Sequence, residues 1–405
     1  MSAVNATKLD LSAPSVIKTI QSRSLAIAGV GTVISLAVAF TRPTEFFRGY
    51  LLSYMDLLGI CLGSMAILMI NHTTGGGWGI SIRRLLGAAM RTWPMFAVLF
   101  VPFAIWGAPR IYQWWSPEQA TDPVIREHLA KHSFIVHDYL NPQGFWIRAI
   151  IYFVLWGGIS YFLSKWSFEL DQPPVRNTSA RFKKLSAPGM IIYAFAISFA
   201  VIDWVMSLNP SWISTIYGLI FVAGQLIAAL AFVIVIERIL SRHRPMAILL
   251  RPSYVHDHGK FLLAFIMLWA YFSFSQWLII WAGNLPEEIS WFLRRLNGGW
   301  QYVGLFLVVF HFFVPFFLLL SRPLKRDISR LVWVAAWMLF VRYVDLFWHI
   351  EPSFSQSFVV TIADLAIPFA MGGLWFAYFC YNLNKWPLIA AYDATAQSVL
   401  EPEHG

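Results

Sequence analysis

Long apolar runs alternate with short polar segments along the whole chain. A bilayer core is about 30 Å thick, so a helix needs roughly 20 apolar residues to cross it. Ten runs of suitable length occur, near 24–41, 48–70, 86–107, 145–167, 187–207, 212–237, 260–282, 299–320, 329–350 and 358–383. The pattern predicts an all-α integral membrane protein with about ten transmembrane helices, most of them unbroken. No small-x-small cleavage site follows the first run, so we expect a helix there and not a signal peptide.

Composition supports this prediction and excludes several other classes of protein. Of the 405 residues, 58% are hydrophobic and 13% are charged, and the mean hydropathy is +0.60. A soluble domain is about 45–50% apolar and about 25% charged. A soluble enzyme, a disordered protein and a disulfide scaffold are therefore excluded.

Cysteine and histidine positions limit the redox centres that this chain could hold. The two cysteines, Cys61 and Cys380, lie inside apolar runs, and neither a CxxC nor a CxxCH motif occurs. We therefore expect no covalently bound haem c and no cysteine-ligated iron–sulfur cluster on this chain. Haem b needs two histidines at one depth, whereas His72, His311 and His349 belong to different depths, so no haem b is expected.

The basic residues predict the orientation in the membrane. Of the 30 Lys and Arg residues, 21 lie in segments on the side of the N-terminus and 8 on the opposite side, with Arg342 inside a span. The positive-inside rule then places both termini in the cytoplasm. Because topology accounts for the net charge of +9, we expect no nucleic-acid partner.

This topology divides the chain into three parts. They are a cytoplasmic N-terminal segment (1–23), a ten-helix transmembrane domain (24–385) and a cytoplasmic tail (386–405). Two connections in the domain are long, the outer loop 108–144 and the inner loop 165–186.

The outer loop contains a histidine-rich stretch. His128 and His132 are four residues apart, followed by His137, and this spacing could ligate a metal ion. A short amphipathic surface helix explains the same spacing, and under this interpretation no metal is expected.

An internal repeat links two of the predicted helix ends. An apolar residue, an aspartate, six residues and then Pro-Ser-aromatic occur at Asp203 to Pro210 and again at Asp345 to Pro352, at an offset of 142 residues. The offset covers four helices, so both copies would have the same orientation. The repeat predicts two parallel four-helix units, spans 2–5 and 6–9, flanked by spans 1 and 10. Coincidence is the alternative, because Pro and Trp are common at helix starts, where we expect Pro210 and Pro352.

Ionisable residues inside the apolar runs are the candidate functional residues, because a carboxylate at this depth costs about 2.5–3.5 kcal/mol to insert. They are Asp56, Asp203, His311, Arg342, Asp345, His349 and Asp364. The carboxylates and His349 belong to the outer half, and His311 lies near mid-span. Such groups can relay protons, which predicts a proton path or a site that takes protons from a quinol.

Structural explanations for the same residues stay open. Asp345 could pair with Arg342 at i,i+3 on one helix face, and residues near a span end can reach water. Glu237, next to Arg238, is interpreted as a charge at the membrane interface.

Several stretches carry a family pattern. They are Asp203–Thr215 (DWVMSLNPSWIST), Tyr139-Leu140-Asn141 with Phe145, Arg148 and Tyr152-Phe153, His258–Phe265 (HGKFLLAF) continuing through Trp269-Ala270-Tyr271 to Phe274-Ser275-Gln276, and Asn284–Glu288 (NLPEE). These stretches resemble the NrfD/polysulfide-reductase-like membrane subunits of bacterial alternative complex III. The chain is more similar to the second, shorter of the two such subunits in that complex. The matches run from about residue 139 to 290.

The resemblance implies a multi-pass subunit in the bacterial plasma membrane, in a complex that oxidises menaquinol or ubiquinol. Electrons would pass to haem c and iron–sulfur clusters on partner subunits, and a sibling NrfD-like subunit carries the better-supported quinol site. This chain, not catalytic alone, would supply scaffold and a proton half-channel, with part of a quinol site as an open alternative. A stand-alone secondary transporter with a parallel internal repeat is the competing hypothesis. A membrane transferase is a third, although no nucleophile–base arrangement is visible.

Overall fold

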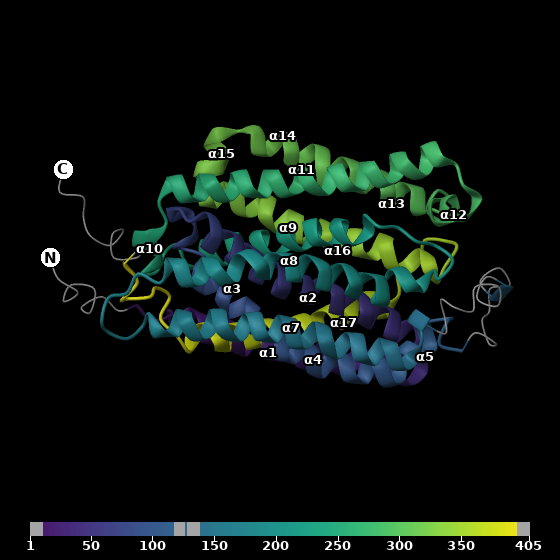
Figure 1. Cartoon of the computed structure of the whole chain (residues 1–405), viewed down its shortest axis with the longest axis horizontal. Helices are drawn as coiled ribbons and strands as arrows, with labels where there is room; N and C mark the ends of the chain where they lie inside the picture. Colours follow the sequence, from purple (N-terminus) through teal and green to yellow (C-terminus); the bar gives the residue numbers. More distant parts are fainter. Residues whose placement is uncertain (1–10, 117–125, 128–137, 395–405) are drawn as a thin grey trace.

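The protein is an all-α helical bundle (Figure 1). The computed structural model describes residues 11–116, 126–127 and 138–394. Within these ranges, ten helical segments are long and apolar enough to cross a membrane. The predicted fold class, an all-α integral membrane protein, is confirmed.

The ten membrane-crossing segments agree with the ten predicted runs, with shifted ends. Their bounds are Val16–Thr41 (α1), Pro43–Thr74 (α2), Arg83–Ile111 (α3 to α5), Pro142–Glu169 (α7), Ser179–Leu208 (α8 and a 3-10 turn), Tyr217–Leu240 (α9), Pro252–Gly283 (α11), Trp300–Leu320 (α13 to α14), Ile328–Ser353 (α16 and a 3-10 turn) and Ile362–Asn384 (α17). Short helices lie between them at Met246–Leu249 (α10), Pro286–Arg295 (α12) and Arg322–Arg326 (α15). The first helix begins at Val16 and not near residue 24.

Two helices form the centre of the bundle. The most apolar 18-residue window of α2 is 89% buried and that of α9 is 83% buried, whereas the corresponding windows of α1 and α11 are 28% and 22% buried. The two central helices approach closely because Gly63 of α2 lies against the backbone of Gln225 in α9, where an added Cβ would be 2.2 Å from a carbonyl oxygen. The outer helices expose apolar side chains, as expected for surfaces that face lipid.

The two predicted four-helix units have the same pattern of neighbours. In the first unit α2 contacts α8, α8 contacts α7, α7 contacts α4, and α4 contacts α2. In the second unit α9 contacts α16, α16 contacts α13 and α14, α14 contacts α11, and α11 contacts α9. The units meet along α2 and α9, while α1 packs on α17. This arrangement agrees with the repeat inferred from the sequence.

The third and eighth spans are interrupted, which the sequence, with its prediction of mostly unbroken helices, did not locate. The third consists of α3 (Arg83–Met90), α4 (Trp93–Pro102), a π-helical segment (Phe103–Gly107) and α5 (Ala108–Ile111). In the eighth, a π-helical segment (Val308–Phe313) separates α13 (Trp300–Leu307) from α14 (Val314–Leu320). Prolines contribute to both interruptions, because they lack the N–H that an α-helical turn requires: Pro94 and Pro102 in the third span, Pro315 in the eighth.

The repeat prolines lie at the ends of helices and not at the starts of the next ones. Pro210 follows the 3-10 turn Met206–Leu208, and the next helix begins only at Tyr217. Pro352 lies within the 3-10 turn Glu351–Ser353, and α17 begins at Ile362. Neither proline therefore starts the next membrane-crossing helix.

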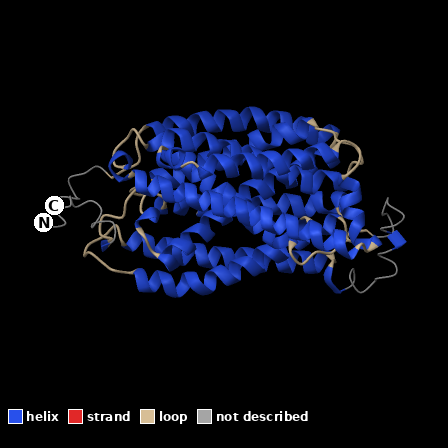
Figure 2. Cartoon of the chain, turned by 90° about the horizontal axis from the view of Figure 1, so that it is seen from above, coloured by secondary structure: helices blue, strands red, loops and turns tan. Residues whose placement is uncertain are grey.

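Both ends of the described chain lie at one end of the bundle, as Figures 1 and 2 show. The N–H of Leu388 donates to the carbonyl of Leu11 at 2.8 Å, and the N–H of Tyr392 donates to Leu170 at 2.9 Å. We call this end the terminal end. The end of α5 and the start of α7 lie at the opposite end of the bundle, which we call the long-loop end.

Candidate functional site

The seven candidate residues lie in separate places. Arg342, Asp345 and His349 contact one another on α16 in the second unit, and His311 of the eighth span lies within electrostatic reach of Arg342 and His349. We call these four residues the α16 cluster. Asp56 lies on α2 within electrostatic reach of Arg342. The other two candidates, Asp203 and Asp364, have partners of their own.

Helical spacing brings three members of the α16 cluster together. Arg342, Asp345 and His349 are separated by three and four residues, so they share one face of α16. That face packs on α9, and the three side chains are at most 4% exposed. Arg342 forms an ion pair with Asp345, and His349 Nε2 lies 3.6 Å from Asp345 Oδ1. The ion pair between Arg342 and Asp345 that the i,i+3 spacing suggested is therefore present, and it forms part of the α16 cluster.

A glycine in α9 leaves the space that Arg342 occupies. A Cβ added to Gly224 would lie 2.3 Å from the guanidinium carbon of Arg342. The same guanidinium lies over the ring of Phe221, 5.4 Å from its centre. The buried charge is therefore held by an ion pair and by a cation–π contact.

His311 completes the cluster from the π-helical segment of the eighth span. Its ring is fully buried and its centre lies 3.8 Å from that of Trp269. Both of its ring nitrogens, Nδ1 of His349 and Oδ1 of Asp345 have no hydrogen-bond partner within the described part of the chain. Most buried polar atoms have a partner, and π-helical turns are frequent at functional sites. The cluster thus combines proton-binding atoms with unused hydrogen-bonding capacity.

Asp203 has a different environment, because donors from the preceding helix use its carboxylate. Arg148 Nε donates to Asp203 at 2.9 and 3.1 Å, and Tyr152 Oη donates at 2.7 Å. Arg148 also lies over the ring of Tyr139, 4.0 Å from its centre. Asp203 therefore connects α8 to α7 through charged and phenolic hydrogen bonds.

Asp364 acts as a helix cap. Its carboxylate accepts hydrogen bonds from the backbone N–H and the hydroxyl of Thr361, at 2.7 and 2.8 Å, which forms a capping box at the start of α17. Tyr343 Oη donates to the carbonyl of Asp364 at 2.6 Å. This carboxylate therefore has a local structural role.

The two copies of the repeat meet at the long-loop end. Asn209 Nδ2 donates to Ser353 Oγ at 3.0 Å, and Arg294 donates to Asn209 Oδ1 at 3.2 Å. Arg295, which is 1% exposed, donates to the carbonyls of Trp348 and His349 at the end of α16. Burial lowers the pKa of Arg295 to about 9, so the guanidinium stays charged at neutral pH and stabilises the helix C-terminus.

A buried pair on the terminal side was missed at the sequence level. Glu237 of α9 and His258 of α11 are fully buried, with Oε2 and Nδ1 3.0 Å apart. His258 Nε2 lies 2.8 Å from the carbonyl oxygen of Trp78. Since a carbonyl oxygen only accepts, Nε2 carries the hydrogen of this contact, whereas Nδ1 of His258 and both carboxylate oxygens of Glu237 have no hydrogen-bond partner among the described residues. The interpretation of Glu237 as an interface charge is therefore wrong.

Arg48 and Glu351 form a second unpredicted pair. They connect α2 to the 3-10 turn after α16, and Glu351 is fully buried. Arg48 and Glu351 are 303 residues apart in the sequence, so no local spacing could predict that they pair. The only sequence signal was that each is a charged residue next to an apolar run.

No metal-binding group is found in the described ranges, in the sense of three or more His, Cys, Asp or Glu side chains placed together. His128, His132 and His137 lie outside the described residues.

Comparison with known proteins adds no family assignment. No protein-family model matches the chain, and no curated protein matches its sequence.

Proposed function

We propose that this chain is a membrane subunit of a bacterial quinol-oxidising complex of the alternative complex III type, in which it supplies scaffold and a proton half-channel. The α16 cluster is the observation that carries the proton role. Its imidazoles and carboxylate are buried together, and several of their proton-binding atoms have no partner among the described residues.

The position of the cluster supports a path from the long-loop end into the membrane. His349 lies near the end of α16, Asp345 lies one turn deeper, and His311 lies near the middle of its span. A neutral imidazole has one ring nitrogen that accepts a hydrogen and one that donates it, so it can pass a proton to or from a nearby carboxylate. Quinol oxidation releases protons together with electrons, so such a path would serve a quinol site within the complex.

The pair of Glu237 and His258 supports a second proton-holding position toward the terminal end. It lies at the other end of α9 from the cluster, where Oε2 of Glu237 and Nδ1 of His258 are 3.0 Å apart. In the proposed orientation the terminal end faces the cytoplasm of a bacterium, and both termini lie there.

Electron transfer in this proposal belongs to partner subunits. Haem c and iron–sulfur clusters would be held by those subunits, and menaquinone or ubiquinone would bind at or near this chain. The motifs that resemble alternative complex III subunits support this assignment, as do the two cysteines, which are single and buried.

Purification in a mild detergent tests whether the chain belongs to such a complex. A tagged chain should co-purify with haem-containing and iron–sulfur subunits and with a sibling membrane subunit. Isolation of the chain alone from native membranes, with no redox partner, would contradict the assignment.

The proton role is tested in the purified complex. His349→Gln should lower quinol turnover and the linked proton release about tenfold or more, because positioned acid–base groups contribute at least that much. His243→Gln, between α9 and α10, is the matched control and should leave both rates unchanged. If both His349→Gln and His311→Gln keep full turnover and proton release, the cluster is not a proton path.

A stand-alone secondary transporter is a second candidate, and the interrupted third and eighth spans favour it. Transporters often bind substrate where helices are broken near the middle of the membrane. The isolated chain in proteoliposomes should then carry out substrate or ion flux, whereas a complex subunit should be silent in that assay.

A further inference from the structure

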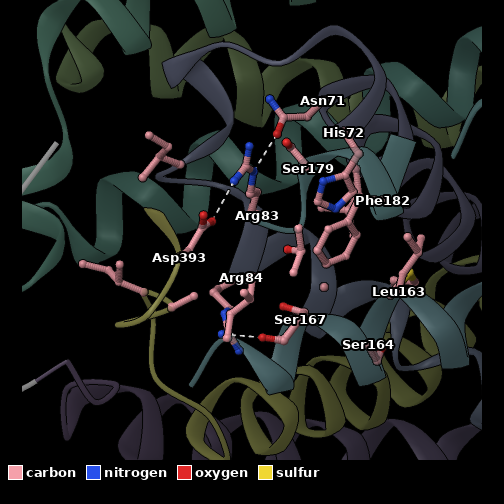
Figure 3. A pocket seen from close by; sticks show the side chains of 18 of the residues that line it. Asn71, His72, Arg83, Arg84, Leu163, Ser164, Ser167, Ser179, Phe182 and Asp393 are labelled. Carbon is pink, nitrogen blue, oxygen red and sulfur yellow. Dashed lines mark hydrogen bonds and ion pairs between the residues drawn. The ribbon is translucent and has the colours of Figure 1, made fainter. Parts of the chain in front are cut away.

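A cavity of about 140 Å³ lies within the terminal end of the first unit (Figure 3). Its walls come from the end of α2, the start of α3, the end of α7, the start of α8 and the tail segment 388–393. Figure 3 shows Arg83 between Asn71 and Asp393, while Arg84 extends toward Ser167. Nitrogen donors and hydroxyls make up most of its polar lining.

Three arginines line this cavity, and carboxylates pair with two of them. Arg83 donates to Asp393 at 3.1 Å and to Asn71 Oδ1 at 2.7 Å. Arg84 pairs with Asp171, and these bonds hold both guanidinium groups in place.

Arg91 supplies the unbalanced positive charge. It lies over the ring of Phe168, 4.9 Å from its centre, and makes no ion pair with a carboxylate in the part of the chain that the structure describes. Because Asp171 and Asp393 offset only two of the three arginines, the cavity keeps a net positive charge.

Several donors around the cavity have no acceptor among the described residues. They include Nη1 of Arg84, which is 5% exposed, Nδ2 of the fully buried Asn71, and Nε of Arg91. Ser164 Oγ, in the wall formed by α7, is also without a partner. Buried donors are normally satisfied, so this lining fits a ligand that is rich in acceptors and negatively charged. Phosphate oxygens accept charge-assisted hydrogen bonds from arginine especially well.

We infer that this cavity binds a phosphate group, carried either by a phospholipid head group or by a free phosphorylated small molecule. The position of the cavity near the ends of the membrane-crossing helices is accessible both to a lipid head group and to a soluble phosphorylated molecule. α2 ends at Thr74, α7 ends at Glu169 and α8 begins at Ser179, so the cavity lies where apolar spans give way to polar segments. Basic pockets between helices at this level hold lipid head groups.

Thermal unfolding of the purified full chain in a neutral detergent tests the inference. One arm adds millimolar inorganic phosphate, and the other adds phosphatidylglycerol to the micelles, with the zwitterionic phosphatidylcholine as the comparison lipid. At least one arm should raise the unfolding temperature. A rise with phosphatidylglycerol alone identifies the head group as the source, and a rise with inorganic phosphate alone identifies a soluble phosphorylated molecule.

Variants that remove one positive charge show whether phosphate or lipid binds in this cavity. Arg91→Gln should weaken the apparent affinity about tenfold or more, the loss expected for one charge-assisted hydrogen bond. Lys184→Gln, an exposed cation near the start of α8, removes the same charge outside the cavity and should bind as the parent does. The absence of any stabilisation in both arms, or equal effects of the two variants, would overturn the inference.

Ser164→Leu keeps every charge and fills the cavity from α7, in case Arg91→Gln does not fold. It should abolish the stabilisation by phosphate or lipid while the chain remains folded. Undiminished stabilisation in the folded Ser164→Leu variant would also rule the cavity out.

Discussion

At the scale of single residues, Asp203 and Asp345 show how one sequence pattern gives two electrostatic environments. Both aspartates hold the same place in the repeat, and both are fully buried. The donors to Asp203 come from α7, and both of its carboxylate oxygens accept hydrogen bonds. Asp345 pairs with Arg342 on its own helix and keeps one oxygen without a hydrogen bond among the described residues. Proton exchange needs available atoms, so Asp345 is the stronger candidate.

Removal of one partner from the buried pair should be more harmful than removal of both. Asp345→Asn removes the ion-pair partner of the buried Arg342, and we expect it to destabilise the fold by about 3–5 kcal/mol. Adding Arg342→Gln should recover much of that loss, because no unpaired charge then remains. Thermal unfolding of the two single variants and the double variant in detergent gives the coupling energy. Additive losses would show that the pair is not coupled.

Gly224 gives a steric test of the same cluster. Gly224→Ala places a methyl group where the guanidinium of Arg342 lies, at 2.3 Å from its central carbon. Such overpacking should cost about 1–3 kcal/mol. Gly372→Ala in α17 is the control, since no atom lies within 4 Å of its added Cβ, and it should be neutral or slightly stabilising. Equal unfolding temperatures for the two variants would argue against the tight fit.

At the scale of helices, small residues set the packing of the first helix on the last. A Cβ at Gly31 would lie 2.5 Å from the backbone nitrogen of Ala370, and one at Gly373 would lie 2.7 Å from the carbonyl oxygen of Ser24. Close backbone approach at small residues is a common way for helices to associate in membranes. It explains why α1, which exposes most of its surface, still has a defined place in the bundle.

A bulky residue on this contact should detach α1 from α17. We expect Gly31→Leu to separate the two helices, to lower the unfolding temperature, and to make the N-terminal region more sensitive to limited proteolysis in detergent. Gly29→Leu, two residues earlier on an open face with no atom within 4 Å, should leave both properties unchanged. The same proteolysis pattern for the two variants would contradict a glycine-dependent contact.

The number and approximate positions of the membrane-crossing helices could be predicted from the sequence. The interruptions within helices and the side-chain pairs between different helices could not. A run of about 20 apolar residues is a strong signal, so all ten spans were recognised. No residue pattern in the sequence predicts the π-helical segment around His311. Pro315, just after it, indicates only that the helix is disturbed nearby. Glu237 and His258 lie on different helices, and only the packing of α9 on α11 brings them within 3.0 Å. Local patterns carry no information on such distances.

At the scale of the whole molecule, the two ends of the bundle differ in both predicted charge and structure. The described chain begins and ends at the terminal end, where Leu388 bonds to Leu11 and the tail covers the arginine-lined cavity. Most basic residues of the connecting segments were predicted for this side. The long-loop end instead joins the two repeat copies through Asn209 and Ser353. A proton path that opens at the long-loop end would therefore face the side opposite to the termini.

Cysteine labelling in whole cells can test the proposed orientation, because Cys61 and Cys380 are both buried and should not react with a membrane-impermeant maleimide. Ser357→Cys places an exposed thiol at the long-loop end, and Asn177→Cys places one at the terminal end. Under the positive-inside rule the terminal end faces the cytoplasm, so intact spheroplasts should label only the Ser357→Cys protein. Permeabilised cells should label both, which controls for the reactivity of each thiol. Labelling of Asn177→Cys alone in intact spheroplasts would reverse the orientation, and the α16 cluster would then open toward the cytoplasm.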